Sequence, residues 1–207
     1  MNILIVSSSA NGERSVSGQL AARYAEAARA TNPATRIVRR DVGAEPLPHL
    51  TAATVAAIKG EPATEAEHEA RVLSDRLIGE LKAADVVVIA SPMYNFGMSS
   101  TLKAWFDHVA RAGITFRYTA EGPEGLLKGK KTVVIESRAG FYGEGGTPHM
   151  DGQEPHLRAL LGFVGLDDVS WIRAEKLAFG PEAAAASIEA AARELNDIAA
   201  SALPLAA

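Results

Sequence analysis

The fold is decided by the stretch Asp85-Val86-Val87-Val88-Ile89-Ala90-Ser91 and the five residues that follow it, Pro92-Met93-Tyr94-Asn95-Phe96. The first segment is a nearly unbroken apolar run, which is typical of a parallel strand with helices on both faces. From Ser99 onward, apolar residues recur at helical spacing, so a helix follows. Residues 92–96 therefore form a loop at the carboxyl end of a strand, where open α/β sheets bind their ligands.

The rest of the chain alternates strands and helices from end to end. Besides the strand at 85–91, four more are predicted, at residues 3–6, 35–42, 131–137 and 169–173. A capping box formed by Thr64 and Glu67 marks the start of one of the intervening helices. Five strands joined by crossovers predict a doubly wound parallel α/β sheet with the flavodoxin-like order 2-1-3-4-5, in a single domain over residues 1–207.

Composition excludes several kinds of site. The 207 residues include no cysteine, so disulfides, thiolate metal sites and a thiol nucleophile are excluded, and redox chemistry needs a cofactor. A formal net charge of −4 without a basic stripe makes nucleic acid an unexpected partner. No apolar run approaches the roughly 20 residues of a membrane span, and the first residues carry no basic leader. We therefore expect no membrane partner and a cytoplasmic location.

The loop after the first strand, residues 7–17, is rich in serine and ends where a helix begins. Free backbone N–H groups at a helix start favour anions, and the hydroxyls of Ser9, Ser15 and Ser17 add donors. Arg14 either assists them or is merely solvated. The chain lacks GxGxxG and GxxxxGK[ST] after this strand, which argues against a dinucleotide site and an NTPase. The loop is interpreted as a cradle for a terminal phosphate, although taken alone it also fits an ordinary helix cap.

A third loop, residues 137–146, follows the fourth predicted strand and is dense in glycine. Such glycines let backbone amides approach a flat ring closely, and the alternative is a merely flexible loop. In the predicted order, the first, third and fourth strands are neighbours, so their loops form one continuous rim. A phosphate, a linker and an aromatic ring could span that rim.

These motifs resemble the FMN-dependent NADH:azoreductase family, a branch of the flavodoxin-like quinone reductases, and the resemblance extends nearly end to end. It implies that the FMN phosphate is held by Ser9, Ser15, Val16 and Ser17. It implies further cofactor-binding residues in the two ring loops, namely Pro92, Met93, Tyr94, Asn95, Phe96, Ser137, Arg138, Ala139 and Gly140. It also implies a homodimer with the flavin sites at its interface. Family members often carry two glycines after the Ser-Arg pair, and Ala139 in the first of these places disfavours a positive φ there.

The activity that the resemblance implies is electron transfer from NADH through FMN to quinones and aromatic azo compounds. Donor and acceptor would occupy one pocket in turn, in a ping-pong sequence. The candidates for apolar walls around the substrate are Phe116, Tyr118 and Phe163. The alternative is that these rings pack in the core or at an interface, which is the commoner role of aromatic residues. His149 is a candidate proton donor, and the alternative is an ordinary solvated histidine in a loop. His108 is expected at a surface or an interface.

Two other functions share this fold and cofactor. A flavodoxin-type electron carrier would also bind FMN, but an acidic docking face is expected of a carrier, and a net charge of −4 is modest. A flavin-binding regulatory protein without turnover would use the same binding residues. Rapid NADH oxidation by the purified protein separates the enzyme from both.

Overall fold

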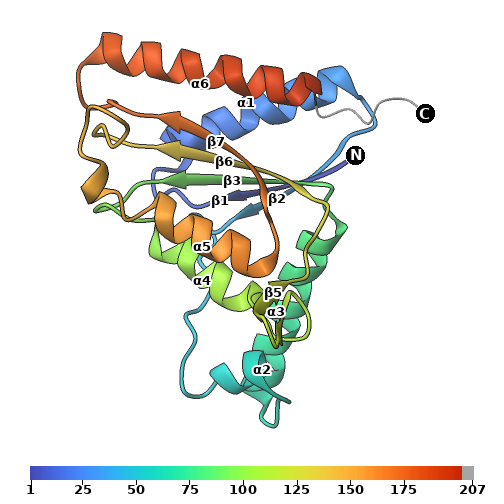
Figure 1. Cartoon of the computed structure of the whole chain (residues 1–207). Helices are drawn as coiled ribbons and strands as arrows, with labels where there is room; N and C mark the ends of the chain where they lie inside the picture. The colour runs from blue at the N-terminus through green and yellow to red at the C-terminus, as the bar shows by residue number, and fades with distance from the viewer. Residues whose placement is uncertain (202–207) are drawn as a thin grey trace.

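A five-stranded parallel sheet lies between two layers of helices in the computed structural model, which describes residues 1–201 (Figure 1). The strands of this sheet are β1 (Asn2–Ser7), β2 (Arg36–Asp41), β3 (Val86–Pro92), β6 (Lys131–Ser137) and β7 (Asp168–Ala174). Their order is β2-β1-β3-β6-β7, and every neighbouring pair is parallel. Counted along the chain, this is 2-1-3-4-5, so the predicted flavodoxin-like order is confirmed.

The helices cover both faces of the sheet. They are α1 (Val16–Thr31), α2 (Val55–Lys59), α3 (Glu65–Ala83), α4 (Ser100–Val109), α5 (Glu154–Val164) and α6 (Pro181–Ser201), with short 3-10 turns η1 (Gly12–Arg14) and η2 (Pro148–Met150). Figure 1 shows α1 and α6 on one face and α3, α4 and α5 on the other. Within residues 1–201, no helix combines the length and the apolar character of a membrane span.

Two hydrophobic cores follow from this layering. Along β1, Ile3 and Ile5 pack with residues of α1 and α6, whereas Leu4 and Val6 pack on the opposite face with α3 and α4. All seven residues of β3 are buried, because this strand has a neighbour on each side and helices above and below. Its continuous apolar run is the sequence pattern that such a position selects.

Helix starts are fixed by hydroxyl side chains. Ser15, Thr64 and Ser99 each accept a hydrogen bond from the backbone N–H three residues further on, which satisfies one of the free donors of a first turn. At Thr64, the Glu67 carboxylate also accepts the N–H of Thr64, so the predicted capping box is confirmed. The cap at Ser15 sets the start of α1 immediately after the serine-rich loop.

A short antiparallel hairpin outside the main sheet was not predicted. Its strands are β4 (Phe116–Thr119) and β5 (Gly122–Gly125). It packs against the C-terminal end of α5, where a Cβ on Gly125 would lie 2.1 Å from the backbone nitrogen of Gly165. Each strand has only four residues, and the sequence Gly-Pro-Glu-Gly of the second lacks the alternation that identifies a strand.

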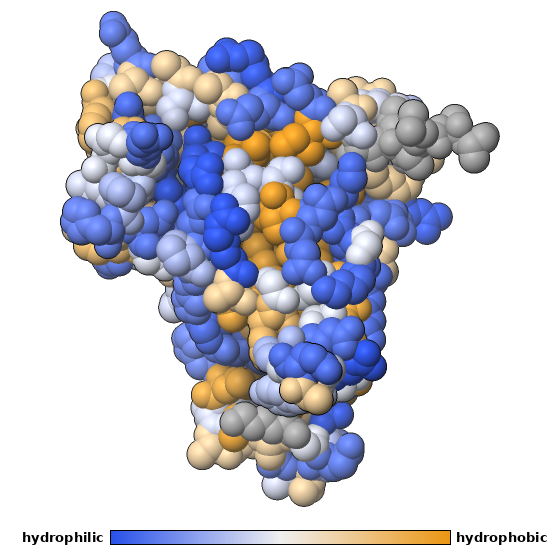
Figure 2. All heavy atoms as spheres, viewed as in Figure 1, coloured by the Kyte–Doolittle hydropathy of each residue, from blue (hydrophilic) through white to orange (hydrophobic). Residues whose placement is uncertain are grey.

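Strand β7 forms one edge of the sheet and is only partly covered. Figure 2, in the orientation of Figure 1, shows apolar surface between α5 and α6, framed by hydrophilic residues. Val169 and Trp171 of this strand are half-buried against the core. The guanidinium of Arg158 lies over the Trp171 ring, 4.2 Å from its centroid, and so a charged side chain shields the exposed edge.

Candidate functional site

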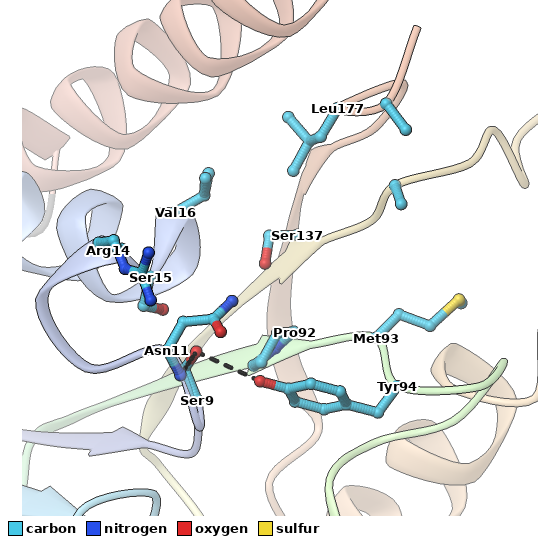
Figure 3. Close-up of a pocket in the computed structure, with 12 residues that line it drawn as sticks. Ser9, Asn11, Arg14, Ser15, Val16, Pro92, Met93, Tyr94, Ser137 and Leu177 are labelled. Carbon is cyan, nitrogen blue, oxygen red and sulfur yellow. Dashed lines mark hydrogen bonds between the residues drawn. The ribbon is translucent and has the colours of Figure 1, made fainter.

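A cavity of about 230 Å³ lies at the carboxyl ends of the strands (Figure 3). Its lining residues are Ser9, Asn11, Arg14, Ser15, Val16, Pro92, Met93, Tyr94, Ser137, Ala139, Leu177 and Ala178. The three loops named from the sequence meet here, as the strand order predicts. The loop after β7 contributes Leu177 and Ala178, which the sequence analysis missed, although the neighbouring position of β7 in the predicted sheet was a signal for them.

One end of the cavity is polar and lies at the start of α1. Ser15 Oγ accepts the N–H of Gly18 at 3.0 Å and lies 3.3 Å from Ser17 Oγ. Ser17 itself is fully buried and does not line the cavity. Arg14 is the charged residue of the lining, and the structure of residues 1–201 shows no ion pair for it. Free N–H groups of the first helical turn add to this positive environment.

Tyr94 joins the loop after β3 to the loop after β1. Its hydroxyl accepts the backbone N–H of Ala10 at 3.0 Å and lies 3.5 Å from Ser9 Oγ, the interaction drawn as a dashed line in Figure 3. The backbone N–H of Met93 donates to the carbonyl of Ser137 at 2.9 Å. Hydrogen bonds within the chain therefore hold the three loops in contact.

The tip of the loop after β3 has an unusual backbone. Asn95 and Phe96 have positive φ angles of 47° and 72°, in a tight turn closed by backbone hydrogen bonds between Tyr94 and Gly97. Asparagine tolerates this conformation, whereas phenylalanine in it is strained. Neither side chain lines the cavity, and Phe96 is exposed. Two of the residues predicted to bind the ring, Asn95 and Phe96, therefore lie at the margin of the cavity and not in its lining.

The loop after β6 does not need a glycine at position 139. Among the described residues, only Asn95, Phe96 and Lys176 combine a side chain with a positive φ, so Ala139 is unstrained. Ala139 lines the cavity, whereas Gly140 does not. A Cβ on Gly140 would lie 2.9 Å from the Tyr142 hydroxyl, so a larger residue there would require the Tyr142 ring to shift.

Arg138 is buried behind the cavity and does not line it. Its Nη2 lies 2.7 Å from Glu136 Oε2 and 3.1 Å from Asp151 Oδ2, and its Nη1 lies 3.3 Å from Glu175 Oε1. Its Nε donates to Gln153 Oε1 at 3.1 Å. The guanidinium therefore serves as the centre of an ion-pair cluster. Sequence reasoning missed these partners, which lie as far as 37 residues away.

Two carboxyls of this cluster are shifted in opposite directions. Burial raises the pKa of Glu136 to about 7, against the attraction of Arg138, and the charges of Glu154 and Asp151 raise it further. Burial also acts to raise the pKa of Glu154, but hydrogen bonds from Arg173 and Arg158 outweigh it and hold the pKa at about 2.

The shift at Glu154 predicts a pH-dependent loss of stability. Because its folded pKa lies below the ordinary 4.5, its contribution is present above pH 4.5 and is lost as the pH falls toward 2. We expect Glu154→Gln to lower the free energy of unfolding by about 1–2 kcal/mol at neutral pH, allowing for partial exposure. In urea titrations at decreasing pH, this difference should shrink, while Glu69→Gln, at an exposed position on α3, changes little. If the difference in unfolding free energy between wild type and Glu154→Gln did not change with pH, the lowered pKa of Glu154 would be contradicted.

The aromatic candidates lie at the other end of α5. The rings of Phe116 and Phe163 are 4.2 Å apart, and Tyr118 packs edge-on against Phe116 at 5.5 Å. Phe116 and Tyr118 belong to the hairpin, which Figure 1 shows away from the carboxyl ends of the strands. None of the three lines the cavity. As substrate walls they could serve only a site on a second copy of the chain.

The two histidines of interest differ from each other. His149 lies in η2, is exposed and does not line the cavity. His108 is buried rather than at a surface, so that expectation is wrong. Its Nε2 lies 2.9 Å from the carbonyl of Pro48, so the ring holds the long loop after β2 against α4.

Comparisons with known proteins agree with this fold. A family model described as flavodoxin-like fold matches residues 1–199. The FMN-dependent NADH:quinone oxidoreductase of Hyphomonas neptunium is 54% identical over 198 residues, which cover 96% of this chain and 95% of that protein. Its namesake from Ralstonia nicotianae is 44% identical over 204 residues, covering 96% and 97%. A crystal structure of an azoreductase from Bacillus anthracis matches with a TM-score of 0.88 at 28% identity, covering 97% of this chain and 99% of that one.

Proposed function

This chain belongs to the flavodoxin-like family that contains the FMN-dependent NADH:quinone oxidoreductases, and from that membership we propose that it is an enzyme transferring electrons from NADH through FMN to quinones. The observation that carries the proposal is the cavity where four loops meet at the carboxyl edge of the sheet. A polar end and apolar walls in one cavity suit a ligand that joins a phosphate to a flat ring.

The lining residues fit FMN at both ends. Ser9, Ser15, Arg14 and the free amides of α1 offer the donors and positive charge that a phosphate monoester with about two negative charges requires. Val16, the first residue of α1, lies beside Ser15 and Arg14 in Figure 3 and belongs to the phosphate end, whereas Leu177 supplies apolar surface to the cavity. We propose that the phosphate lies at α1 and that the ring lies between the loops after β3 and β6.

FMN held in the cavity would supply the redox chemistry, namely hydride transfer from NADH and electron transfer to the acceptor. The chain orients the ring through the Met93 and Tyr94 loop, contributes Ser137 and Ala139 of the loop after β6, and presents apolar walls to flat substrates. We include a ping-pong sequence, in which donor and acceptor occupy the cavity in turn. Aromatic azo compounds form a second acceptor class, which the match to an azoreductase at 28% identity supports.

The proposal also includes a homodimer in the cytoplasm. Exposed apolar side chains occur at the rim, where Phe96 and Met150 lie, and on the hairpin, where Tyr118 is 73% exposed. A second copy that placed its hairpin over the rim would cover both groups. It would also bring its Phe116 and Tyr118 toward the cavity, the arrangement in which they could act as substrate walls. A chain without cysteine fits a reducing compartment.

The visible spectrum of the purified protein with FMN tests the proposal. Under anaerobic conditions, we expect NADH to bleach the bound flavin and a quinone to restore its colour. Bound flavin that NADH does not reduce would favour an electron carrier or a regulatory protein instead. Absence of flavin binding would contradict the assignment of the cavity.

Tyr94→Phe tests the contact between the first and second loops. The change removes the acceptor of the Ala10 N–H and leaves the ring, so we expect FMN affinity to fall about fivefold to tenfold, the effect of one hydrogen bond. Quenching of flavin fluorescence on titration measures it. Tyr24→Phe is the control, because its buried hydroxyl has no hydrogen-bond partner in the structure of residues 1–201. Equal affinities for the two variants would contradict the role of Tyr94.

A further inference from the structure

A buried cluster of charged residues forms the reverse side of the cavity wall. Side chains alternate along β6 and its extension, so Ser137 and Ala139 line the cavity while Glu136 and Arg138 point to the other face. The Glu136 cluster comprises Glu136, Arg138, Asp151, Glu154, Arg173 and Glu175. Its most deeply buried members are thus immediate sequence neighbours of cavity-lining residues.

The Glu136 cluster has an excess of negative groups. Arg138 is shared among four carboxylates, at 2.7 Å from Glu136, 3.1 Å from Asp151, 3.3 Å from Glu175 and 3.6 Å from Glu154. Arg173 adds a second positive charge, 3.7 Å from Glu136 and 2.8 Å from Glu154. A third, from the half-exposed Arg158, reaches only the outer side of Glu154. When all groups are ionised, Glu136 therefore lies in a negative surrounding.

Within the Glu136 cluster, Glu136 itself is the residue whose hydrogen-bonding capacity is least well satisfied. It is 0% exposed, and neither carboxylate oxygen accepts a well-directed hydrogen bond among residues 1–201. Its neighbours across the sheet are Ser91 on β3 and Arg173 on β7, while Asp151 and Glu154 face it from the start of α5. Burial and the charges of Glu154 and Asp151, against the attraction of Arg138, raise the pKa of Glu136 to about 7, so both protonation states are accessible near neutral pH.

Hydrogen bonds connect the cluster to the loops around the cavity. Gln153 accepts from Arg138 Nε, and its amide donates to the carbonyl of Ser91 at 2.9 Å, one residue before the loop after β3. Glu175 accepts the backbone N–H of Tyr142 at 2.9 Å, within the loop after β6. A change of charge at Glu136 therefore acts on Arg138, and through Arg138 on both loops.

We propose that Glu136 is a proton-responsive positioning residue, whose carboxyl takes up a proton when FMN brings the negative charge of its phosphate into the cavity. This inference rests on the proposed function, because it takes FMN as the ligand. An anion placed near an already negative cluster favours the neutral form of its most buried acid. Protonation also leaves Arg138 to three carboxylates instead of four. FMN affinity should consequently fall as the pH rises and Glu136 ionises.

The test compares wild type with Glu136→Gln, which keeps the shape of the side chain and removes its titration. Dissociation constants are measured from about pH 6 to about pH 8.5 for FMN, and riboflavin, which lacks the phosphate and is uncharged, is the control ligand. We expect equal affinities at the acid end. At the alkaline end the variant should bind FMN about threefold to tenfold more tightly than wild type, tenfold being a one-unit rise in the Glu136 pKa on binding, whereas the two proteins should bind uncharged riboflavin alike.

A second measurement reads the proton directly. Calorimetric titration with FMN at about pH 7, in buffers of different ionisation enthalpy, gives the number of protons exchanged on binding. Any exchange by the phosphate itself is common to both proteins, so wild type should take up more protons than Glu136→Gln. Glu189→Gln, an exposed position on α6, is the control and should behave as wild type.

Glu136→Leu replaces the glutamine variant in both experiments if that variant does not fold. Normal flavin binding with the same pH dependence and proton uptake in wild type and variant would overturn this inference alone. Failure of wild type to bind flavin would overturn the proposed function as well.

Discussion

Replacing Arg138 by methionine is expected to lower the free energy of unfolding by about 3–5 kcal/mol at neutral pH. Methionine keeps much of the side-chain stem but removes the guanidinium on which Glu136, Asp151 and Glu175 converge. Breaking a buried ion pair from one side leaves charges that are neither solvated nor paired, which costs far more than the pair contributes when intact. The loss should decrease at acid pH, where the abandoned carboxylates take up protons.

Urea unfolding of the flavin-free protein, followed by circular dichroism, measures this loss. The matched control is Arg158→Met, which removes an arginine of the same network from the solvent side, where its side chain is 53% exposed. For the control we expect a change below about 1 kcal/mol. Similar losses for the two variants would mean that Arg138 is no more important to stability than a surface arginine.

The double change Ser9→Ala and Ser15→Ala is expected to lower FMN affinity roughly 100-fold while affecting riboflavin much less. Both hydroxyls line the polar end of the cavity, beside the start of α1. A hydrogen bond to a charged group contributes about 1.5–3 kcal/mol, so two of them account for the factor. Riboflavin has no phosphate and therefore loses little. Fluorescence titration with both flavins gives the ratio.

Ser15 also caps α1, so this double variant carries a loss of stability of about 1 kcal/mol that must be separated from binding. Thr64→Ala provides the control, because it removes a cap of the same kind from α3, away from the cavity. Its affinity for either flavin should match wild type. Equal losses for FMN and riboflavin in the serine variant would contradict a phosphate site at α1.

The sheet could be predicted from sequence because each strand has a pattern that its position requires. β3 is buried on every side, and its uninterrupted apolar run reveals this directly. The hairpin escaped prediction because β5 is held by a close approach between Gly125 and Gly165, which leaves no hydrophobic alternation to recognise. Local pattern predicts an element only where burial of side chains stabilises it.

The loops of the site could be predicted, but the direction of individual side chains could not. Tyr94 and Arg138 both lie in predicted loops, yet one lines the cavity and the other points into an ion-pair cluster. That difference depends on pairing with distant residues such as Glu175. His108 was misplaced for a related reason, since its partner Pro48 lies in an irregular loop without periodicity.

The cavity is assembled from parts of the chain that lie far apart in sequence. Ser9 and Leu177, at the first and last of its four loops, line the same cavity only after β7 has joined the sheet. A chain emerging from the ribosome therefore cannot capture a ligand here until nearly its whole length has been synthesised. Non-local contacts of this kind also form late and slowly during folding. A ligand present at 100 times its dissociation constant would stabilise the completed fold by about 2.7 kcal/mol. It would thus protect the finished protein from proteolysis, but it would not assist folding.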